Sequence, residues 1–427
     1  MTSCRRFRVA AMPLVLCGSL ACAATACEDA DSPAIAKEQT AIQVDAAVED
    51  DAGSDDAGGT EGIERDVLRP ESREPTPERI ASLQLPEGFA LSVFARDLQH
   101  ARMLAVHERH VYLTRPAQGD VLLLEDTNDD GVADSQKPVA SGLPNVHGIA
   151  IDGDTVYLAT PTQVLRSTLA ATGELSAPEE IISDLPAGGQ HPNRTLGIGP
   201  DHKLYISVGS PCDACAIDDP EYASLLRAEP DGSSREIFAS GLRNTIGFGW
   251  HPVTQALWGM DHGSDWRGDD IPPEELNLIE TGKDYGWPYC YGDRQIDKVI
   301  QAPRDTTKEA YCAKTQPPVL TNQAHEAPIG WAFYTAAQFP AAYRNSAFIA
   351  LRGSWNRIPA TGYKIAQVVF ENGQPTRIAD FVTGFLIEDG TAEFARVAGV
   401  AVSADGSLLF TDDEHGIIYR VTYEREQ

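Results

Sequence analysis

The most regular feature of the chain, from residue 80 onward, is a short alternation of apolar and polar positions, broken by turns about every ten residues. Alternation with a period of two indicates strands that bury one of their faces. Long segments with helical periodicity are almost absent from this region. The pattern therefore predicts an all-β domain of short strands joined by tight turns.

A segment made of a strand, usually a turn, and a second strand recurs six times in this region. One small or apolar marker residue identifies each copy: Leu104, Gly148, Gly197, Gly247, Gly330 and Gly399. Successive markers are 44, 49, 50, 83 and 69 residues apart, and the blades of a β-propeller repeat every ~40–50 residues. We therefore predict a six-bladed β-propeller over residues 81–427, with a β-sandwich as the alternative.

The long intervals and the two ends of this repeat region carry further expectations. Both long intervals are expected to hold insertions, one of which carries residues 268–293. Residues 91–98 (LSVFARDL) precede the first copy, and residues 417–423 (IIYRVTY) end the last one. Pairing between these two segments would place them in one sheet and remove an open sheet edge.

The N-terminus has the composition of an export signal. Basic residues at positions 5, 6 and 8 precede an apolar run that ends in small residues, which predicts a signal peptide over residues 1–26 and a periplasmic or cell-surface location. Cys27 follows Ala-Thr-Ala and is the predicted lipidation site, which would anchor the protein to a membrane. Lipidation at Cys22, cleavage after Ala26 without a lipid, and an uncleaved anchor helix are the alternatives.

An acidic segment follows the signal peptide. Residues 28–75 are rich in Asp, Glu, Ala, Gly, Ser and Pro and poor in aromatic residues. Such a composition buries too little apolar surface to fold, so we predict a flexible linker over residues 27–80. The formal net charge of the chain is −29, which argues against nucleic acid as a partner because nucleic-acid binding needs a basic surface.

Four cysteines remain beyond the signal region. Export implies an oxidising compartment, so we predict the disulfides Cys212–Cys215 and Cys290–Cys312. A Cys-x-x-Cys pair can also be a redox or zinc site. The chain has no second pair of this kind to complete a zinc tetrad.

Residues just before each innermost strand of a propeller approach the central axis. In this chain those residues are Arg102, His147, His191, Arg194, Arg243, Asn244 and Arg396. Buried charges need partners, and guanidinium groups bind carboxylates in a matching fork geometry. We therefore expect a pit at the axis that binds a planar anionic ligand.

The acidic turn DTNDDGVAD (residues 126–134) has the spacing of an EF-hand-type calcium loop. Its predicted ligands are Asp126, Asn128, Asp130 and Asp134. The usual bidentate Glu at the twelfth position is replaced by Lys137. A solvated acidic turn without calcium is the alternative.

Four motifs resemble one family, the quinoprotein glucose/sorbosone dehydrogenases: HPNRTLGIGPDHKLY (191–205), GLRN (241–244), EELNLIETGKDYGWP (274–288) and ALRGSWNR (350–357). The resemblance extends over about residues 80–424 and is closest to the sorbosone dehydrogenase branch, because of HGIAI, HEAPIGWAFY and GSWNR. It implies a six-bladed propeller that binds pyrroloquinoline quinone (PQQ) and Ca²⁺. The implied activity is oxidation of an aldose or sugar aldehyde, with electrons passed to a quinone or a cytochrome.

The resemblance also implies roles for individual residues. His191 matches the catalytic base, which takes a hydroxyl proton from the reducing carbon of the sugar while hydride moves to PQQ. Arg243 matches an arginine near the quinone oxygens, where it stabilises charge as the ring is reduced. The residues implied to hold PQQ are Arg102, His147, Asn244, Arg352 and Arg396.

Calcium ligands follow from the same resemblance. The backbone carbonyls of Gly263 and Ser264 are expected to hold the Ca²⁺ that contacts PQQ. Glu275 and the carbonyl of Tyr285 are expected to bind a second, structural Ca²⁺. Carbonyl and carboxylate oxygens are the ligands that Ca²⁺ prefers.

Two positions depart from the family pattern. Ser210 stands where glucose-oxidising members have an Asp that orients the base, so His191 is expected to be a weaker base or to use another partner such as Asp213. Ala398 stands where a second cofactor-binding arginine is expected. Neither departure removes His191 or Arg243.

Other interpretations of the same residues remain open. A calcium-dependent hydrolase or lactonase, or a non-catalytic binding propeller, could share the fold, and His191 could be a core histidine that bonds a backbone carbonyl. Trp287 and Trp355 are expected to pack between blades. The remaining histidines, expected to be structural or on the substrate side, are His251, His262 and His325.

Overall fold

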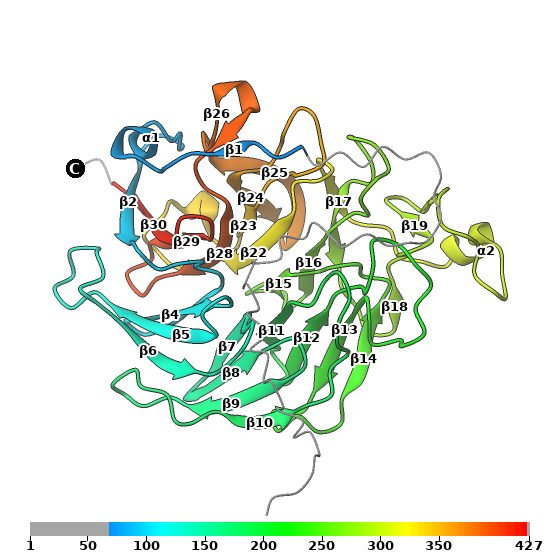
Figure 1. Ribbon diagram of the computed structural model, residues 1–427, viewed down its shortest axis with the longest axis horizontal. Helices are drawn as coiled ribbons and strands as arrows, with labels where there is room; N and C mark the ends of the chain where they lie inside the picture. Colours follow the sequence, from blue (N-terminus) through cyan, green and yellow to red (C-terminus); the bar gives the residue numbers. More distant parts are fainter. Residues whose placement is uncertain (1–67, 425–427) are drawn as a thin grey trace, which may run out of the picture. The chain divides into compact units, whose positions relative to one another are not determined.

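Six sheets of mainly antiparallel strands form the framework of residues 68–424, the part of the chain that the computed structural model describes (Figure 1). All of the described residues belong to one compact unit. The predicted signal peptide (1–26), lipidation site (Cys27) and linker residues 27–67 lie outside the described part. Within it, no helix is long and apolar enough to cross a membrane.

Blades 1 and 2 contain only consecutive strands, and blade 3 adds one distant short strand to four consecutive ones. Blade 1 consists of β3 (Leu104–His107), β4 (His110–Arg115), β5 (Asp120–Glu125) and β6 (Ser135–Ser141). Blade 2 consists of β7 (Gly148–Asp152), β8 (Thr155–Ala159), β9 (Val164–Thr168) and β10 (Glu179–Ile182). Blade 3 consists of β11 (Arg194–Ile198), β12 (Leu204–Val208), β13 (Ser224–Ala228), β14 (Glu236–Ser240) and the short parallel strand β18 (Lys283–Asp284).

Blades 4 and 6 also take strands from distant parts of the chain. Blade 4 consists of β15 (Gly247–Trp250), β16 (Leu257–Asp261), β17 (Glu274–Leu278) and β21 (Leu320–Asn322). Blade 5 consists of β22 (Pro328–Phe333), β23 (Ala347–Leu351), β24 (Lys364–Glu371) and β25 (Gln374–Val382). Blade 6 consists of β28 (Val397–Val402), β29 (Leu408–Asp412), β30 (Ile417–Tyr423) and β2 (Phe89–Ala95).

Each of the six predicted marker residues lies in an innermost strand. Strands β3, β7, β11, β15, β22 and β28 contact one another in this order, and β28 contacts β3, so they form a closed ring (Figure 1). The predicted closure is confirmed, because β2 pairs with β30 from Phe89 opposite Tyr423 to Ala95 opposite Ile418. The all-β six-bladed propeller is therefore confirmed.

The insertions differ in one respect from the prediction. Residues 274–278, expected inside an insertion, form β17 of blade 4. The insertion proper lies between β17 and β21 and contains β18, β19 (Cys290–Tyr291), β20 (Gln295–Ile296) and helix α2 (Lys308–Cys312). The other long interval adds β26 (Leu386–Ile387) and β27 (Ala392–Glu393), and 3₁₀ turns span Ala341–Tyr343 and Glu388–Gly390.

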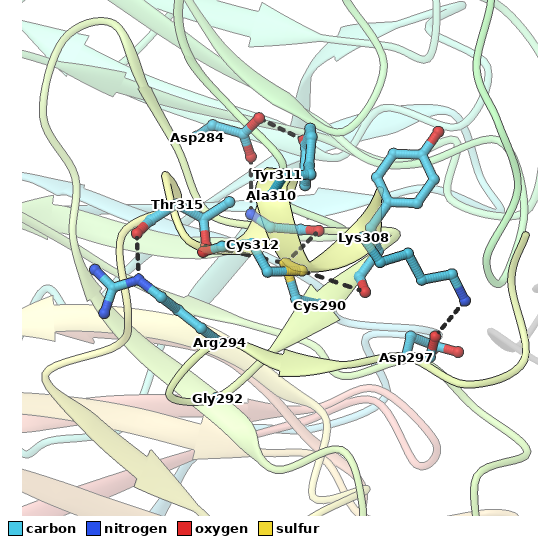
Figure 2. The surroundings of a disulfide bond; sticks show 12 residues. Asp284, Cys290, Gly292, Arg294, Asp297, Lys308, Ala310, Tyr311, Cys312 and Thr315 are labelled. Atoms are coloured by element: carbon cyan, nitrogen blue, oxygen red, sulfur yellow. Dashed lines mark hydrogen bonds between the residues drawn. A yellow bond between two sulfur atoms is a disulfide. The ribbon is translucent and has the colours of Figure 1, made fainter. Parts of the chain in front are cut away.

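Both predicted disulfides are present. Cys290–Cys312 links β19 to α2 within the insertion. Figure 2 shows the surroundings of this disulfide, where Arg294 donates to the carbonyl of Thr315 at 3.0 Å and Lys308 donates to the carbonyl of Asp297 at 2.6 Å. Cys212–Cys215 closes a turn between β12 and β13.

The folded part begins earlier than the predicted boundary at residue 81. Strand β1 (Glu71–Ser72) pairs in parallel with β27, and helix α1 (Pro77–Ala81) follows it. Thr76 caps this helix by accepting a hydrogen bond from the Arg79 amide, as N-terminal Thr residues commonly do. Residues 68–80 therefore belong to the folded unit rather than to the linker.

Apolar residues fill the spaces between neighbouring blades. Leu123 of blade 1 and Leu158 and Val156 of blade 2, for example, belong to one buried cluster. The alternation seen in the sequence arises because successive side chains of a strand enter the spaces on its two sides. Each blade is thus stabilised by burial of apolar area against both neighbours.

Glycine recurs on the inner strands because the strands approach one another closely at the axis. A Cβ atom on Gly148 would lie 2.5 Å from the carbonyl oxygen of Arg194, and one on Gly247 would lie 2.7 Å from that of Ile329. Gly330 and Gly399 face backbone carbonyls of the next blade in the same way. The marker glycines therefore set the width of the hub.

We expect Gly247→Ala to lower the free energy of unfolding by about 1–3 kcal/mol, because its methyl group would overlap a backbone atom that cannot rotate away. Urea unfolding followed by tryptophan fluorescence measures this change. Ser92→Ala on the exposed side of β2 is the control and should change the value by less than ~0.5 kcal/mol. Equal stability of the parent and Gly247→Ala would contradict the close packing of the hub.

Glu393 of β27 gives the stability of the fold a pH dependence. Its side chain is buried, its Oε2 has no hydrogen-bond partner, and burial together with Asp412 and Glu414 raises its pKa to about 7. The folded state therefore binds an extra proton above the ordinary pKa of 4.5, and the free energy of unfolding falls as the pH rises toward 7.

We expect Glu393→Gln to gain stability relative to the parent as the pH rises from 5 to 8, by up to about 3 kcal/mol, since the amide cannot ionise. Unfolding curves at several pH values measure the difference. The same exchange at the exposed Glu371 is the control. Parallel pH curves for the parent and Glu393→Gln would show that this carboxyl does not titrate as described.

Candidate functional site

A pocket of about 450 Å³ lies where loops of blades 3 to 6 meet near the axis. Five of the predicted site residues line it: His191, Arg243, Gly263, Arg352 and Arg396. They come from segments far apart in the sequence, since each lies just before or after an inner strand or its neighbour. The ring closure therefore brings three arginines and the candidate base to one site.

Three other residues predicted to hold the cofactor are buried but do not line this pocket. The Arg102 Nε donates a hydrogen bond to His147 Nε2 at 3.3 Å. His147 Nδ1, which is then protonated, lies 3.3 Å from the carbonyl of Arg194. The backbone N–H of Asn244 donates a hydrogen bond to the Asp261 carboxylate at 2.8 Å. The structure thus places Arg102, His147 and Asn244 in the packing around the pocket.

A buried carboxylate that the sequence analysis missed, Asp413, compensates the arginines of blades 1, 5 and 6. Arg352 donates to it through Nε and Nη2, both at 3.1 Å, and Arg102 forms a second ion pair with it. Burial raises the pKa of Asp413, but the charges of Arg352, Arg102 and Arg396 outweigh burial and hold the pKa well below its usual range. Its signal in the sequence was the acidic pair Asp412-Asp413 at the end of a buried strand.

Arg243 is held by two carboxylates and a carbonyl. Its Nη2 lies 2.8 Å from Asp265 and 3.1 Å from Asp213, and its Nε donates to the Asp213 carbonyl at 3.0 Å. Asp265 also accepts a hydrogen bond from Asn356 at 3.1 Å. Asp213 was considered as a partner for His191, but it contacts Arg243 and Arg267 instead.

The tautomer of His191 follows from the hydrogen bonds of Ser210. The Ser210 hydroxyl donates to the carbonyl of Cys212 at 2.7 Å, so it can only accept from the histidine. His191 Nδ1 lies 2.9 Å from this hydroxyl and 3.0 Å from the Ser210 carbonyl. Nδ1 therefore carries the ring proton, and Nε2 is the basic nitrogen.

Arg194 has a structural role beside the base. Its side chain is fully buried outside the pocket lining and donates to the carbonyls of His191 at 2.8 Å and Pro186 at 2.7 Å. Burial lowers its pKa to about 10, so it stays charged at neutral pH. It fixes the backbone that presents His191 at the start of β11.

The predicted calcium ligands Gly263, Ser264, Glu275 and Tyr285 line a second pocket of about 320 Å³. Gly263 lines both pockets. Burial, with the charge of Asp261 adding to it, raises the pKa of Glu275 to about 8. Carbonyl and carboxylate oxygens suit Ca²⁺, but no group of three His, Cys, Asp or Glu side chains arranged for a metal is found in residues 68–424. These calcium ligands stay predictions.

The acidic turn of residues 126–134 lies between β5 and β6. Asp126 accepts from the Gly131 amide at 2.8 Å, and Asn128 accepts from the Asp130 amide at 2.9 Å. Asp134 accepts from the Thr127 amide at 2.7 Å. These bonds account for the turn itself, and calcium binding by it stays a prediction.

The other histidines and tryptophans divide between the pocket and the packing. His262, His325 and Trp355 line the pocket, whereas His251 packs against Phe333 and Phe370. Trp355 therefore differs from the expectation that it only packs between blades. Burial, with nearby arginines adding to it, lowers the pKa of His325, so this histidine is neutral at pH 7.

Glu274 is a further pocket residue that the sequence analysis missed. Its carboxyl accepts hydrogen bonds from the amides of Gly263 and Ala327, both at 3.0 Å. Burial raises its pKa to about 8. The group is largely protonated at neutral pH, which leaves the pocket with a cationic lining.

The ring of blades defines a β-propeller with an arginine-lined pocket near its axis. The chain belongs to the TrAA12-like family, whose profile matches residues 83–424. An uncharacterised protein from Borreliella burgdorferi is 36% identical over 360 residues, which cover 82% of this chain and 93% of the relative.

Two further relatives carry more informative names. A pyrroloquinoline quinone-dependent sugar dehydrogenase from Hypocrea jecorina is 25% identical over 334 residues, which cover 64% of this chain and 73% of the relative. The calcium structure of a Trichoderma reesei carbohydrate-active enzyme of family AA12 is 21% identical, with a TM-score of 0.68 over 85% of this chain and 99% of that chain. The structural likeness concerns the fold.

We expect Asp413→Asn to lower the free energy of unfolding by about 3–5 kcal/mol, because it leaves buried arginine charges uncompensated. Urea unfolding measures the loss. Glu174→Gln, which removes the exposed partner of Lys137, is the control and should cost less than ~1 kcal/mol. A loss at Asp413 as small as that of the control would contradict the described charge balance.

Proposed function

We propose that this protein is a PQQ- and calcium-dependent dehydrogenase that oxidises an aldose or a sugar aldehyde. The observation that carries the proposal is the convergence of Arg243, Arg352 and Arg396 with an oriented His191 in one pocket at the hub. A relative named as a PQQ-dependent sugar dehydrogenase supports it. Membership of the sorbosone dehydrogenase branch stays a prediction.

The lining of the pocket fits PQQ in charge. PQQ is a planar quinone with three carboxylates, and the guanidinium groups of Arg243, Arg352 and Arg396 can bind such groups in a fork geometry. The predicted carbonyl ligands Gly263 and Ser264 would hold Ca²⁺ beside these arginines. When bound, PQQ supplies a carbonyl that accepts hydride from the substrate.

His191 is the residue that would move the proton. Its Nε2 would take the proton of the hydroxyl group carried by the carbon that loses hydride, and the imidazolium would be stabilised because Nδ1–H is bonded to Ser210. Arg243 stabilises negative charge that develops opposite the base. Its own carboxylate partners, Asp213 and Asp265, keep the guanidinium in place.

Export and the electron acceptor belong to the same proposal. The signal peptide and Cys27 predict a lipid-anchored protein in the periplasm or at the cell surface, where a quinone or a cytochrome would accept the electrons. These residues lie outside the described part of the chain, and the argument for them is the sequence pattern alone.

Reconstitution tests the proposed function. The purified protein is mixed with PQQ and Ca²⁺, and cofactor absorbance and dye reduction are followed with a panel of aldoses and sugar aldehydes. We expect a cofactor spectrum and dye reduction that depends on the sugar. Absence of any spectral change would contradict the proposal, and binding without turnover on any sugar would favour a binding propeller.

We expect His191→Gln to keep PQQ binding and to lower kcat by about 10²–10⁴-fold, because the proton acceptor is lost. Steady-state dye reduction and an absorbance titration of PQQ measure the two effects. His202→Gln, on the exposed β11–β12 turn of the same blade, is the matched control and should keep the parent kcat. Unchanged turnover in His191→Gln would refute the assignment of the base.

A further inference from the structure

The disulfide-closed turn Cys212–Cys215 touches the supports of both His191 and Arg243. It lies in residues 209–223, the connection between β12 and β13, which contains no helix or strand. We propose that this turn is the positioning element for the candidate base and the cofactor-facing arginine. The inference rests on the proposed function and adds a role for residues that the function itself does not use.

The first contact acts on the base. The carbonyl oxygen of Cys212 accepts a hydrogen bond from the Ser210 hydroxyl, with 2.7 Å between the two oxygens. The Ser210 oxygen can then act only as an acceptor for His191 Nδ1, which lies 2.9 Å away. Movement of the Cys212 carbonyl would free the hydroxyl to rotate and donate. The turn therefore helps to select the tautomer that leaves Nε2 basic, at a position where the family pattern has an Asp.

The second contact acts on the arginine through Asp213. The backbone carbonyl of Asp213 accepts from Arg243 Nε at 3.0 Å, and its carboxylate accepts from Arg243 Nη2 at 3.1 Å and from Arg267 at 3.1 Å. The Asp213 carbonyl also accepts from Trp287 at 3.0 Å. Arg243 contacts both the backbone and the side chain of Asp213, so its position depends on the backbone conformation of Asp213.

The disulfide restricts the backbone conformation of Asp213 within a segment that has no regular secondary structure. It holds the Cα atoms of Cys212 and Cys215 at 6.1 Å on either side of Asp213 and Ala214. Cys212 is buried and packs with Ala223 and Trp287, which ties the turn to the neighbouring insertion. A covalent link across so short a turn restricts the backbone angles of Asp213 and thereby the direction of its carbonyl.

The double variant Cys212→Ala/Cys215→Ala tests this role in the PQQ- and Ca²⁺-loaded protein. We expect kcat to fall about tenfold or more, with a smaller change in KM, and the acidic limb of the kcat–pH profile to shift. In protein with ¹⁵N-labelled histidine and without PQQ, the His191 resonances should change from the Nδ1–H tautomer to a mixture. The His191→Gln spectrum assigns these resonances.

Cys290→Ala/Cys312→Ala is the matched control because it removes the other disulfide, whose surroundings are shown in Figure 2. Its thermal stability is expected to fall, but its His191 tautomer and pH profile should match those of the parent. A Cys212/Cys215 double variant that keeps the parent kcat, pH profile and His191 resonances would overturn the proposal.

Three single variants test the proposal if the double variant does not fold. Ser210→Ala keeps the disulfide and should alter the His191 tautomer and pH profile, whereas Asp213→Ala should lower kcat without altering the tautomer, and Asp213→Asn should restore part of the loss. Parent-like behaviour of both alanine variants would overturn the proposal. Because the NMR readout needs no PQQ or sugar, it decides the positioning role even where the proposed enzymatic activity is absent.

Discussion

The pocket depends on how this fold buries guanidinium groups near its axis. Arg102 and Arg352 share the carboxylate of Asp413, and Arg243 is held by Asp213 and Asp265. Removing a charged side chain from water is costly unless an opposite charge and hydrogen bonds replace the water. These carboxylates make the burial possible, and they also fix the direction of each guanidinium group. The pocket is therefore organised before any ligand binds, which lowers the entropic cost of binding.

The inner strands bring these groups together. Their glycines let each strand approach the backbone of the next blade, so the hub is narrow and the loops at the strand ends meet around one pocket. Arg194 then fixes the loop before β11, and the turn after β12 fixes the side chains of His191 and Arg243. Packing of the inner strands thus sets the width of the site. The polar contacts of the loops set the positions of the side chains that give the site its chemistry.

The sequence predicted the parts of the structure that depend on local pattern. The six strand repeats, the pairing of the two ends and both disulfides could be read from spacing, alternation and cysteine content. Asp413 and Asp265 could not be found in this way, because their importance arises from arginines more than twenty residues away along the chain. For the same reason Arg102, His147 and Asn244 were assigned to the pocket although they do not line it. Residues 274–278 were assigned to an insertion because strand pairing with a distant β21 leaves no local signature.

A crystal structure of the protein grown with PQQ and Ca²⁺ tests the central claim most directly. We expect the quinone in the hub pocket, with its carboxylates bound by Arg243, Arg352 and Arg396 and with His191 in the same pocket. Electron density for the cofactor elsewhere on the protein, or a hub pocket that stays filled with water at saturating PQQ, would contradict it.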